Sequence, residues 1–387
     1  MLFFASFLSL SACKKVPVTE IAVIEVEPGE GDASATLETA AAELDVAVRA
    51  RALSLLIRYE GAEWGPRALF DPSPYVQRAG VEALAERDED DAYALIASLA
   101  ARDVDPYTRS HAAVALIRAG HSVPDLGWND ERLHWRRAPL ALPAAMQGDT
   151  TALEALGADL SRGDYPLEIA FFLHVGASGL PVADSLIEGS KLVEEELELA
   201  IANALLDLGH AEGESRFREA LHSDNLERRL EAVDYLAQRD DEIALVLLKR
   251  AKNIGPEPVE DWATLALIAR GEHPPDPAFA ALVSTDRELR QQAVWSLSHW
   301  VLATEGAGRN KKQAHRAIVA MLGDPEPVVV MESIQALGRA GMMDDRALLA
   351  GFMSQDDRGM SIEAAGAILA IESRDGLASA AVGLGED

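Results

Sequence analysis

Residues 71–84 read DPSPYVQRAGVEAL, and the same pattern returns at residues 105–116, DPYTRSHAAVAL, and at residues 324–337, DPEPVVVMESIQAL. Each stretch opens with an aspartate and a proline. This pair suits a helix start, because the carboxylate can cap free backbone N–H groups and proline is tolerated at the first helical position. The apolar and small residues that follow recur at helical spacing. Each stretch therefore predicts a helix that buries one face against its neighbours.

The last strong apolar anchor of these helices recurs at a nearly fixed interval. The anchors are Leu56, Leu84, Leu116, Leu142, Leu173, Leu205, Leu236, Leu267, Leu297, Leu337 and Leu369. Their ten steps average about 31 residues, and a fixed period of this size is typical of solenoid proteins. The chain is therefore expected to be built from one repeated unit.

A further apolar segment with helical spacing precedes several of these helices, at residues 92–101, 217–221, 243–251 and 314–322. Two helices per period form an antiparallel hairpin. A single hairpin cannot bury its apolar stripe, so neighbouring hairpins must stack. We therefore expect an all-α fold, an α-solenoid of roughly eleven stacked helical hairpins.

These units resemble HEAT-like repeats of the short bacterial kind, which also occur in proteins related to phycobilisome lyases. The resemblance covers nearly all of residues 43–375. It implies that an Asp and an Arg four residues apart form a ladder between neighbouring units. Four units carry such a pair: Asp45/Arg49, Asp105/Arg109, Asp224/Arg228 and Asp286/Arg290. Several other units lack this Arg, so we expect the ladder to be interrupted.

Two units depart from the regular pattern. Pro139 and Pro143 fall where the second helix of the fourth unit should run, and a proline inside a helix costs about 3 kcal/mol. This helix is therefore expected to be short or kinked. Residues 303–312, ATEGAGRNKK, lengthen one step of the period to 40 residues and are expected to form an inserted loop.

The N-terminus is expected to carry a targeting signal. Residues 1–12 are largely apolar, too few to cross a bilayer but enough for the core of a signal peptide, although no Lys or Arg precedes them. Leu10-Ser11-Ala12-Cys13 resembles a bacterial lipobox, in which the signal is cleaved before a cysteine that then carries acyl chains. Lys14 follows the cysteine where inner-membrane retention would need Asp, so for a Gram-negative source the resemblance implies an outer-membrane lipoprotein that faces the periplasm.

Three segments are expected on these grounds. Residues 1–12 form a lipoprotein signal peptide, residues 13–42 a flexible acidic tether, and residues 43–387 the HEAT-like repeat solenoid. The tether is inferred from scattered Pro, Gly and acidic residues without sustained periodicity. It would hold the solenoid away from the membrane.

Charge limits the partners. The formal net charge is −29, so the summed field repels nucleic acid phosphates and anionic membrane surfaces. We expect no nucleic acid partner, and we expect a protein partner with a basic or mixed-charge face. Binding of such a partner should weaken as salt rises.

Motifs for chemistry are sparse. The nine histidines show no metal-ligand spacing, the acidic runs lack the pattern of a calcium loop, and no nucleophile, nucleotide or dinucleotide motif occurs. We therefore expect no catalytic, metal or cofactor-binding residue, and no enzymatic activity. Trp128, Trp135 and Trp300 are candidate partner-binding residues, because they flank the two irregular regions and tryptophan is enriched at binding hot spots.

The sequence leaves two functions open. The first is a lipid-anchored envelope scaffold that binds protein or peptide partners on the curved surface of the repeat array. The alternative is a HEAT-like repeat enzyme, or an enzyme accessory, of the bilin-lyase-related type that acts in the cytoplasm. An envelope assembly factor without a discrete ligand cannot be separated from the first function by sequence.

Overall fold

The computed structural model describes residues 31–102, 105–160, 198–207, 209–304, 308–355 and 357–383. Within these ranges the chain forms α-helices and short 3-10 turns and contains no β-strand. The signal peptide, Cys13 and the Leu173 anchor lie outside the described residues. The expected all-α solenoid of stacked helical hairpins is confirmed.

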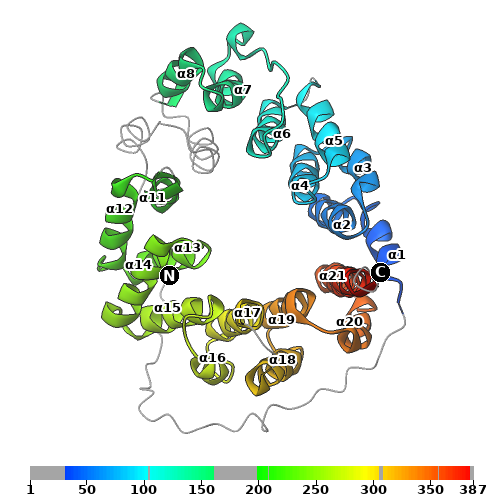
Figure 1. Ribbon diagram of the computed structural model, residues 1–387, viewed down its shortest axis with the longest axis vertical. Coiled ribbons are helices and arrows are strands. Elements are labelled where there is room, and N and C mark those ends of the chain that lie inside the picture. The colour runs from blue at the N-terminus through cyan, green and yellow to red at the C-terminus, as the bar shows by residue number, and fades with distance from the viewer. Residues whose placement is uncertain are drawn as a thin grey trace.

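Each hairpin contributes one helix to the inner side of the molecule and one to the outer side (Figure 1). The inner helices are α2 (Val46–Tyr59), α4 (Pro74–Ala85), α6 (Pro106–Arg118), α7 (His134–Met146), α11 (Glu198–Asp207), α13 (Leu226–Ala237), α15 (Glu257–Ala269), α17 (Arg287–Ala303), α19 (Pro327–Ala340) and α21 (Arg358–Gly383). The outer helices are α1 (Ala33–Ala40), α3 (Gly65–Leu69), α5 (Asp90–Ala100), α8 (Thr150–Leu160), α12 (Ala211–Leu221), α14 (Glu242–Ile254), α16 (Asp276–Ala281), α18 (Arg309–Met321) and α20 (Arg346–Met353).

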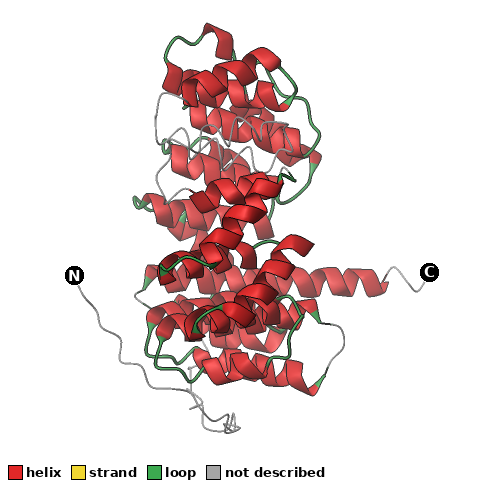
Figure 2. Cartoon of the chain, turned by 90° about the vertical axis from the view of Figure 1, so that its left-hand side faces the viewer, coloured by secondary structure: helices red, strands yellow, loops and turns green. Residues whose placement is uncertain are grey.

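The two ends of the array meet. Helices α1 and α2 pack against α21, and α1 also contacts α20, so the first and last hairpins close on each other, and we call the closed array the ring (Figure 1). Leu37 of α1 and Leu55 of α2 are buried in the same core as Ile362 of α21. Helix α21 is longer than its neighbours and projects beyond the edge of the ring, as Figure 2 shows.

Part of the expected tether belongs to this closure. Residues 33–40 form α1 instead of flexible chain, and Asp32 caps its first turn through a hydrogen bond from the Ala35 backbone N–H. Leu37 and Ala40 are fully buried. This helix is difficult to predict from the sequence because it is short and carries only one large apolar residue. Its packing partner α21 also lies more than 300 residues away along the chain.

The ladder exists, but its pairing differs from the expected one. Asp45 and Asp286 cap their own helices, whereas Arg49 and Arg290 reach forward to the next unit. Arg49 Nε lies 2.9 Å from Asp71 Oδ2, and Arg290 Nε lies 2.7 Å from Asp324 Oδ2. Two further rungs join Arg78 to Asp105 and Arg137 to Asp159. Arg109 donates to the Ala100 carbonyl, and Arg228 bonds to Glu198.

These rungs show that the inner helices run in the same direction around the ring. Each rung joins the first or second turn of one inner helix to the aspartate at or near the end of the next unit's outer helix, so the starts of successive inner helices lie side by side. At the opposite edge, Arg87 after α4 donates to the Ile57 carbonyl near the end of α2. We call the edge where the inner helices begin the leading rim, and the opposite edge the trailing rim.

Two of the three Asp-Pro pairs do not cap the helix that follows. Asp105 caps α6 as expected, with Pro106 at the first position. Helices α4 and α19 begin two residues later, at Pro74 and Pro327. Asp71 and Asp324, which precede these helices, instead accept hydrogen bonds from Arg49 and Arg290.

The irregular regions are more helical than expected. Helix α7 continues through Pro139 and Pro143 for 13 residues, so the proposed shortening is wrong. The prolines are four residues apart, so both missing N–H donors lie on one face of the helix. The inserted loop is also shorter than expected, because α17 extends to Ala303 and Arg309–Lys312 form the first turn of α18.

Candidate functional site: the inner face of the ring

The inner face is the side of each inner helix that its neighbours leave uncovered. In α17, Ala293, Val294 and Leu297 are fully buried, and the opposite face carries Trp295 and His299. Helices α16 and α18 lie outside α17 (Figure 1). The uncovered face of α17 therefore points to the inside of the ring.

The same argument places carboxylates of α13 on the inner face. Ala232, Val233 and Leu236 are buried against neighbouring helices, and Glu231 and Asp234 lie on the opposite face. Desolvation raises the pKa of the Asp234 carboxyl above its ordinary value, although its side chain is exposed to solvent. This combination fits a group that water reaches but that protein surrounds on several sides.

Asp261 on α15 is the most perturbed carboxylate on this side of the ring. Desolvation, together with the negative charges of Glu257 and Glu260, raises its pKa to about 6. Among the described residues, none gives it a hydrogen bond or an ion pair. The charged form of the Asp261 carboxyl is therefore destabilised, and a cation bound beside it would stabilise that form.

An aromatic pair lies on the next inner helix. The Trp295 and His299 rings on α17 are 4.6 Å apart between centroids. Desolvation, with a smaller contribution from the Arg339 charge, lowers the pKa of His299 to about 4, so this imidazole is neutral at pH 7. A neutral ring beside an indole suits packing against an apolar or cationic side chain.

Polar side chains link many of the neighbouring inner helices. Arg51 of α2 bonds to Glu363 of α21, and Arg58 of α2 bonds to Glu86, just beyond α4. Further links join His111 to Glu82, Asp207 to Arg239, Gln291 to Glu332 and Arg339 to Ser298. Helices α13 and α15 are different, because Asp234 and Asp261 receive no cation among the described side chains. We call Glu231, Asp234, Asp261, Trp295 and His299 the α13–α17 sector.

The structure separates the three candidate tryptophans. Trp300 is 8% exposed and belongs to the main core, so the expectation that it contacts a partner is wrong; it fills space between helices. Trp128 lies in a 3-10 turn, partly buried against two core clusters. Trp135, at the start of α7, is exposed with its ring beside Arg136. Trp135 is therefore the most exposed of the three, at 41%.

Sequence reasoning missed the α13–α17 sector. Its residues follow no short motif, because they come from three separate repeats. Their position relative to the anchors gives a signal, since Asp234 and Trp295 each precede their anchor leucine by two residues. Aligning the repeats on the anchors would have placed both on one face.

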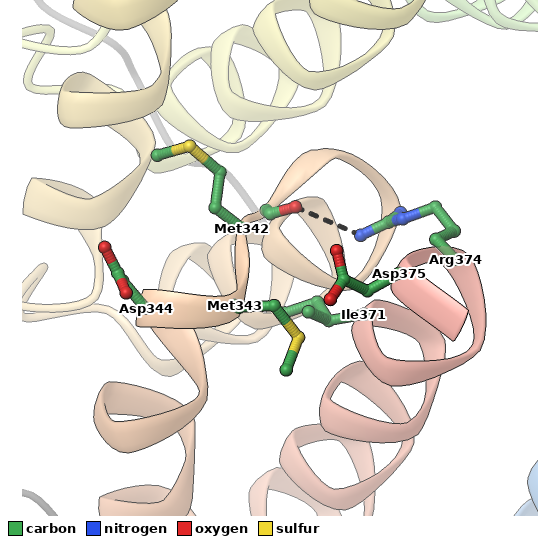
Figure 3. Close-up of a pocket in the computed structure, with 7 residues that line it drawn as sticks. Met342, Met343, Asp344, Ile371, Arg374 and Asp375 are labelled. Atoms are coloured by element: carbon green, nitrogen blue, oxygen red, sulfur yellow. Dashed lines mark hydrogen bonds between the residues drawn. The ribbon is translucent and has the colours of Figure 1, made fainter. Parts of the chain in front are cut away.

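A separate hollow lies at the trailing rim, between the end of α19 and α21 (Figure 3). Its volume is about 420 Å³, and Met342, Met343 and Ile371 contribute to its lining. Arg374 also lines it but donates to backbone carbonyls at the end of α19, including that of Gly341. These bonds fix the arginine as a helix-end clamp.

Neither a metal cluster nor a membrane span occurs in the part of the chain that the structure describes. No group of three or more metal-ligating side chains is found there. None of its helices combines the length and apolar character that crossing a bilayer requires.

Comparison with known proteins assigns no family to the chain. No family model and no curated protein sequence matches the chain. An engineered protein from the Northeast Structural Genomics Consortium is 17% identical, with a TM-score of 0.25 over 89% of this chain and 99% of its own. Human deoxyhypusine hydroxylase, solved with glycerol, is 17% identical, with a TM-score of 0.28 over 80% of this chain and 95% of its own. Such values assign no activity.

The expectation that the chain has no enzymatic activity is corrected, because it rested only on the absence of familiar short motifs. Deoxyhypusine hydroxylase, one of the two similar structures, is an enzyme by name, and the claim that this chain is not an enzyme is not supported. The physical reason is that a repeat array can assemble a site from side chains of several units, and no short stretch of sequence then reports it.

Proposed function

We propose that this protein is a lipid-anchored envelope scaffold whose inner face binds a basic segment of a partner protein. The observation that carries the binding proposal is the pair Asp234 and Asp261. Their pKa values are raised by desolvation, and neither has a cation partner among the described side chains. A Lys or Arg side chain placed beside them would offset this desolvation.

The neighbouring Trp295 adds to this preference for a basic side chain. An indole face attracts a cation within about 6 Å of its centroid, so a basic side chain can contact carboxylate and ring together. The net charge of −29 also speeds the approach of a basic partner at low salt.

Binding of a Lys–Ser repeat peptide tests this part of the proposal. We expect Asp234→Asn with Asp261→Asn to weaken binding at least tenfold, because one hydrogen bond to a charged group contributes about 1.5–3 kcal/mol and a tenfold change corresponds to about 1.4 kcal/mol. The control is Glu154→Gln with Glu219→Gln, which makes the same change in charge at exposed positions on the outer helices α8 and α12. If the test variant and the control variant weaken binding equally, the effect comes from the overall negative charge of the protein. That result would contradict a binding site in the α13–α17 sector.

The lipid anchor rests on the lipobox resemblance around Cys13 and is tested separately. Intact mass should show acylation at Cys13, and Cys13→Ala should abolish membrane partitioning in the native host. An unprocessed, soluble chain with a free thiol would contradict the envelope address. Peptide binding by the inner face would be unaffected by that result.

A further inference from the structure

Exposed apolar side chains gather at one edge of the ring. Of the 15 large hydrophobic residues that are exposed in the described part of the chain, ten lie at the starts of inner helices, in the turns that lead into them or, for Ile254, at the end of the preceding outer helix. They are Leu44, Val46, Phe70, Tyr75, Leu133, Trp135, Leu226, Ile254, Val283 and Val328. The leading rim therefore carries more exposed apolar side chains than the trailing rim.

Leu44 shows that this exposure is not a by-product of helix capping. It precedes the N-cap residue Asp45, where an apolar side chain can pack on the first turn of the helix. The fourth helical residue is Arg49, however, and Leu44 is 97% exposed. Leu44 therefore contributes little to packing within the ring.

An ion pair holds the densest part of the rim together. The Arg49 guanidinium donates to the Leu44 carbonyl at 2.8 Å and to the Asp71 carboxylate at 2.9 and 3.0 Å. Leu44 and Phe70, which precedes Asp71, therefore lie within reach of one guanidinium. We call Leu44, Val46, Phe70 and Tyr75 the rim patch.

The charges around the leading rim indicate the chemistry of its partner. The exposed carboxylates at this edge belong to Asp45, Asp130, Asp224, Glu227, Glu257, Asp286, Glu288 and Asp357, and the exposed cations to Arg132, Arg287 and Arg358. This excess of carboxylates disfavours an anionic lipid surface, and it disfavours a second ring that brings the same edge face to face.

We propose that the leading rim is a second docking surface, which takes a protein segment that combines apolar side chains with Lys or Arg. Apolar side chains of the partner contact the rim patch, and its cations face exposed carboxylates of the leading rim such as Asp45 and Asp357. This surface is separate from the inner face, and the proposal does not depend on the function proposed for that face.

The probe is a fluorescein-labelled amphipathic helix of Leu and Lys, titrated with the full chain and followed by anisotropy. Leu44→Ser with Tyr75→Ser should weaken binding about tenfold, because it removes two exposed anchors at the interface. Val246→Ser with Leu302→Ser is the control, since both residues are more than half exposed, at 53% and 55%, but lie away from this edge. The control should change binding less than about twofold.

Three results would overturn the proposal. The first is equal loss in the rim and control variants. The second is sedimentation that shows a dimer which the rim variant abolishes, and the third is rim-dependent binding to vesicles of phosphatidylethanolamine and phosphatidylglycerol. The Asp234→Asn, Asp261→Asn variant should retain affinity for the Leu–Lys helix, which separates this test from that of the inner face.

Discussion

Arg51 and Glu363 are 312 positions apart in the chain and form a two-bond ion pair across the closure of the ring. Arg51 Nε lies 2.5 Å from Glu363 Oε1, and Arg51 Nη2 lies 2.7 Å from Glu363 Oε2. The pair joins α2 to α21, beside the buried contact between Leu55 and the α21 backbone at Gly366. It is thus a direct chemical link between the first and last inner helices.

Removing one partner of this pair should loosen the closure. We expect Arg51→Ala to lower the free energy of unfolding by about 1–2 kcal/mol, because it leaves the largely buried Glu363 without its cation. Urea unfolding gives the free energy, and hydrogen exchange should show faster exchange in α1 and α21. Arg58→Ala is the comparison, since its partner Glu86 is mostly exposed and the loss should stay below about 1 kcal/mol. Unchanged exchange in α1 would contradict a role in closure.

The ladder pair Arg290–Asp324 should be one of the most costly pairs to break. Both side chains are buried, and Arg290 also donates to the Ser284 carbonyl. Asp324→Ala should destabilise the fold by about 3 kcal/mol, because it leaves a buried guanidinium without its carboxylate. Arg287→Ala, which breaks the exposed pair with Glu326 at 3.8 Å, should cost less than about 0.5 kcal/mol. Thermal or urea unfolding distinguishes the two, and similar losses would refute the ladder's importance.

Asp261 should make the fold less stable as pH rises. Its carboxyl ionises near 6 in the folded chain but near its ordinary value of 3.8 when unfolded. The folded state therefore holds the proton more tightly, and stability falls as pH rises from about 4 to about 6. Asp261→Asn should be more stable than the parent at pH 7 and equal to it below pH 4, in urea unfolding at each pH. A Glu219→Gln control should show no such difference, and a flat Asp261→Asn comparison would contradict the raised pKa.

His299 should make the fold less stable as pH falls, which is the opposite of the effect of Asp261. Its folded pKa of about 4 lies below the ordinary value of 6.5, so the unfolded chain binds the proton more readily between these values. The stability that the neutral imidazole provides is complete above pH 6.5 and is lost as pH falls toward 4. His299→Gln should remove this acid-sensitive component while leaving stability at pH 7 within about 1 kcal/mol. An NMR titration of the imidazole with a midpoint near 6.5 would disprove the shift.

The repeat itself could be predicted because it rests on local signals. Anchor leucines such as Leu236 and Leu297 recur at a nearly constant interval, and small and apolar residues before them define one helix face. Asp105 with Pro106 marks a helix start through the geometry of a single turn. Such patterns act within a few residues, so they are visible without the rest of the chain.

The candidate site was less predictable, because it depends on burial. Trp300 and Trp135 look equally suitable in sequence, yet one lies in the core and the other at the surface. The raised pKa of Asp261 comes from surrounding helices and from two carboxylates of its own first turn. Neither the surroundings nor the direction of a side chain follows from residue type.

By itself the sequence determined that the chain forms stacked helical hairpins of one period, because helix starts, apolar faces and anchors are encoded within each unit. Only the tertiary structure decided that Arg49 pairs with Asp71 of the next unit, that α1 seals against α21, and that Arg51 meets Glu363. The physical reason is that ring closure depends on the small rotation between neighbouring hairpins. That rotation is set by packing at every interface and accumulates over the whole array, so no single repeat contains it.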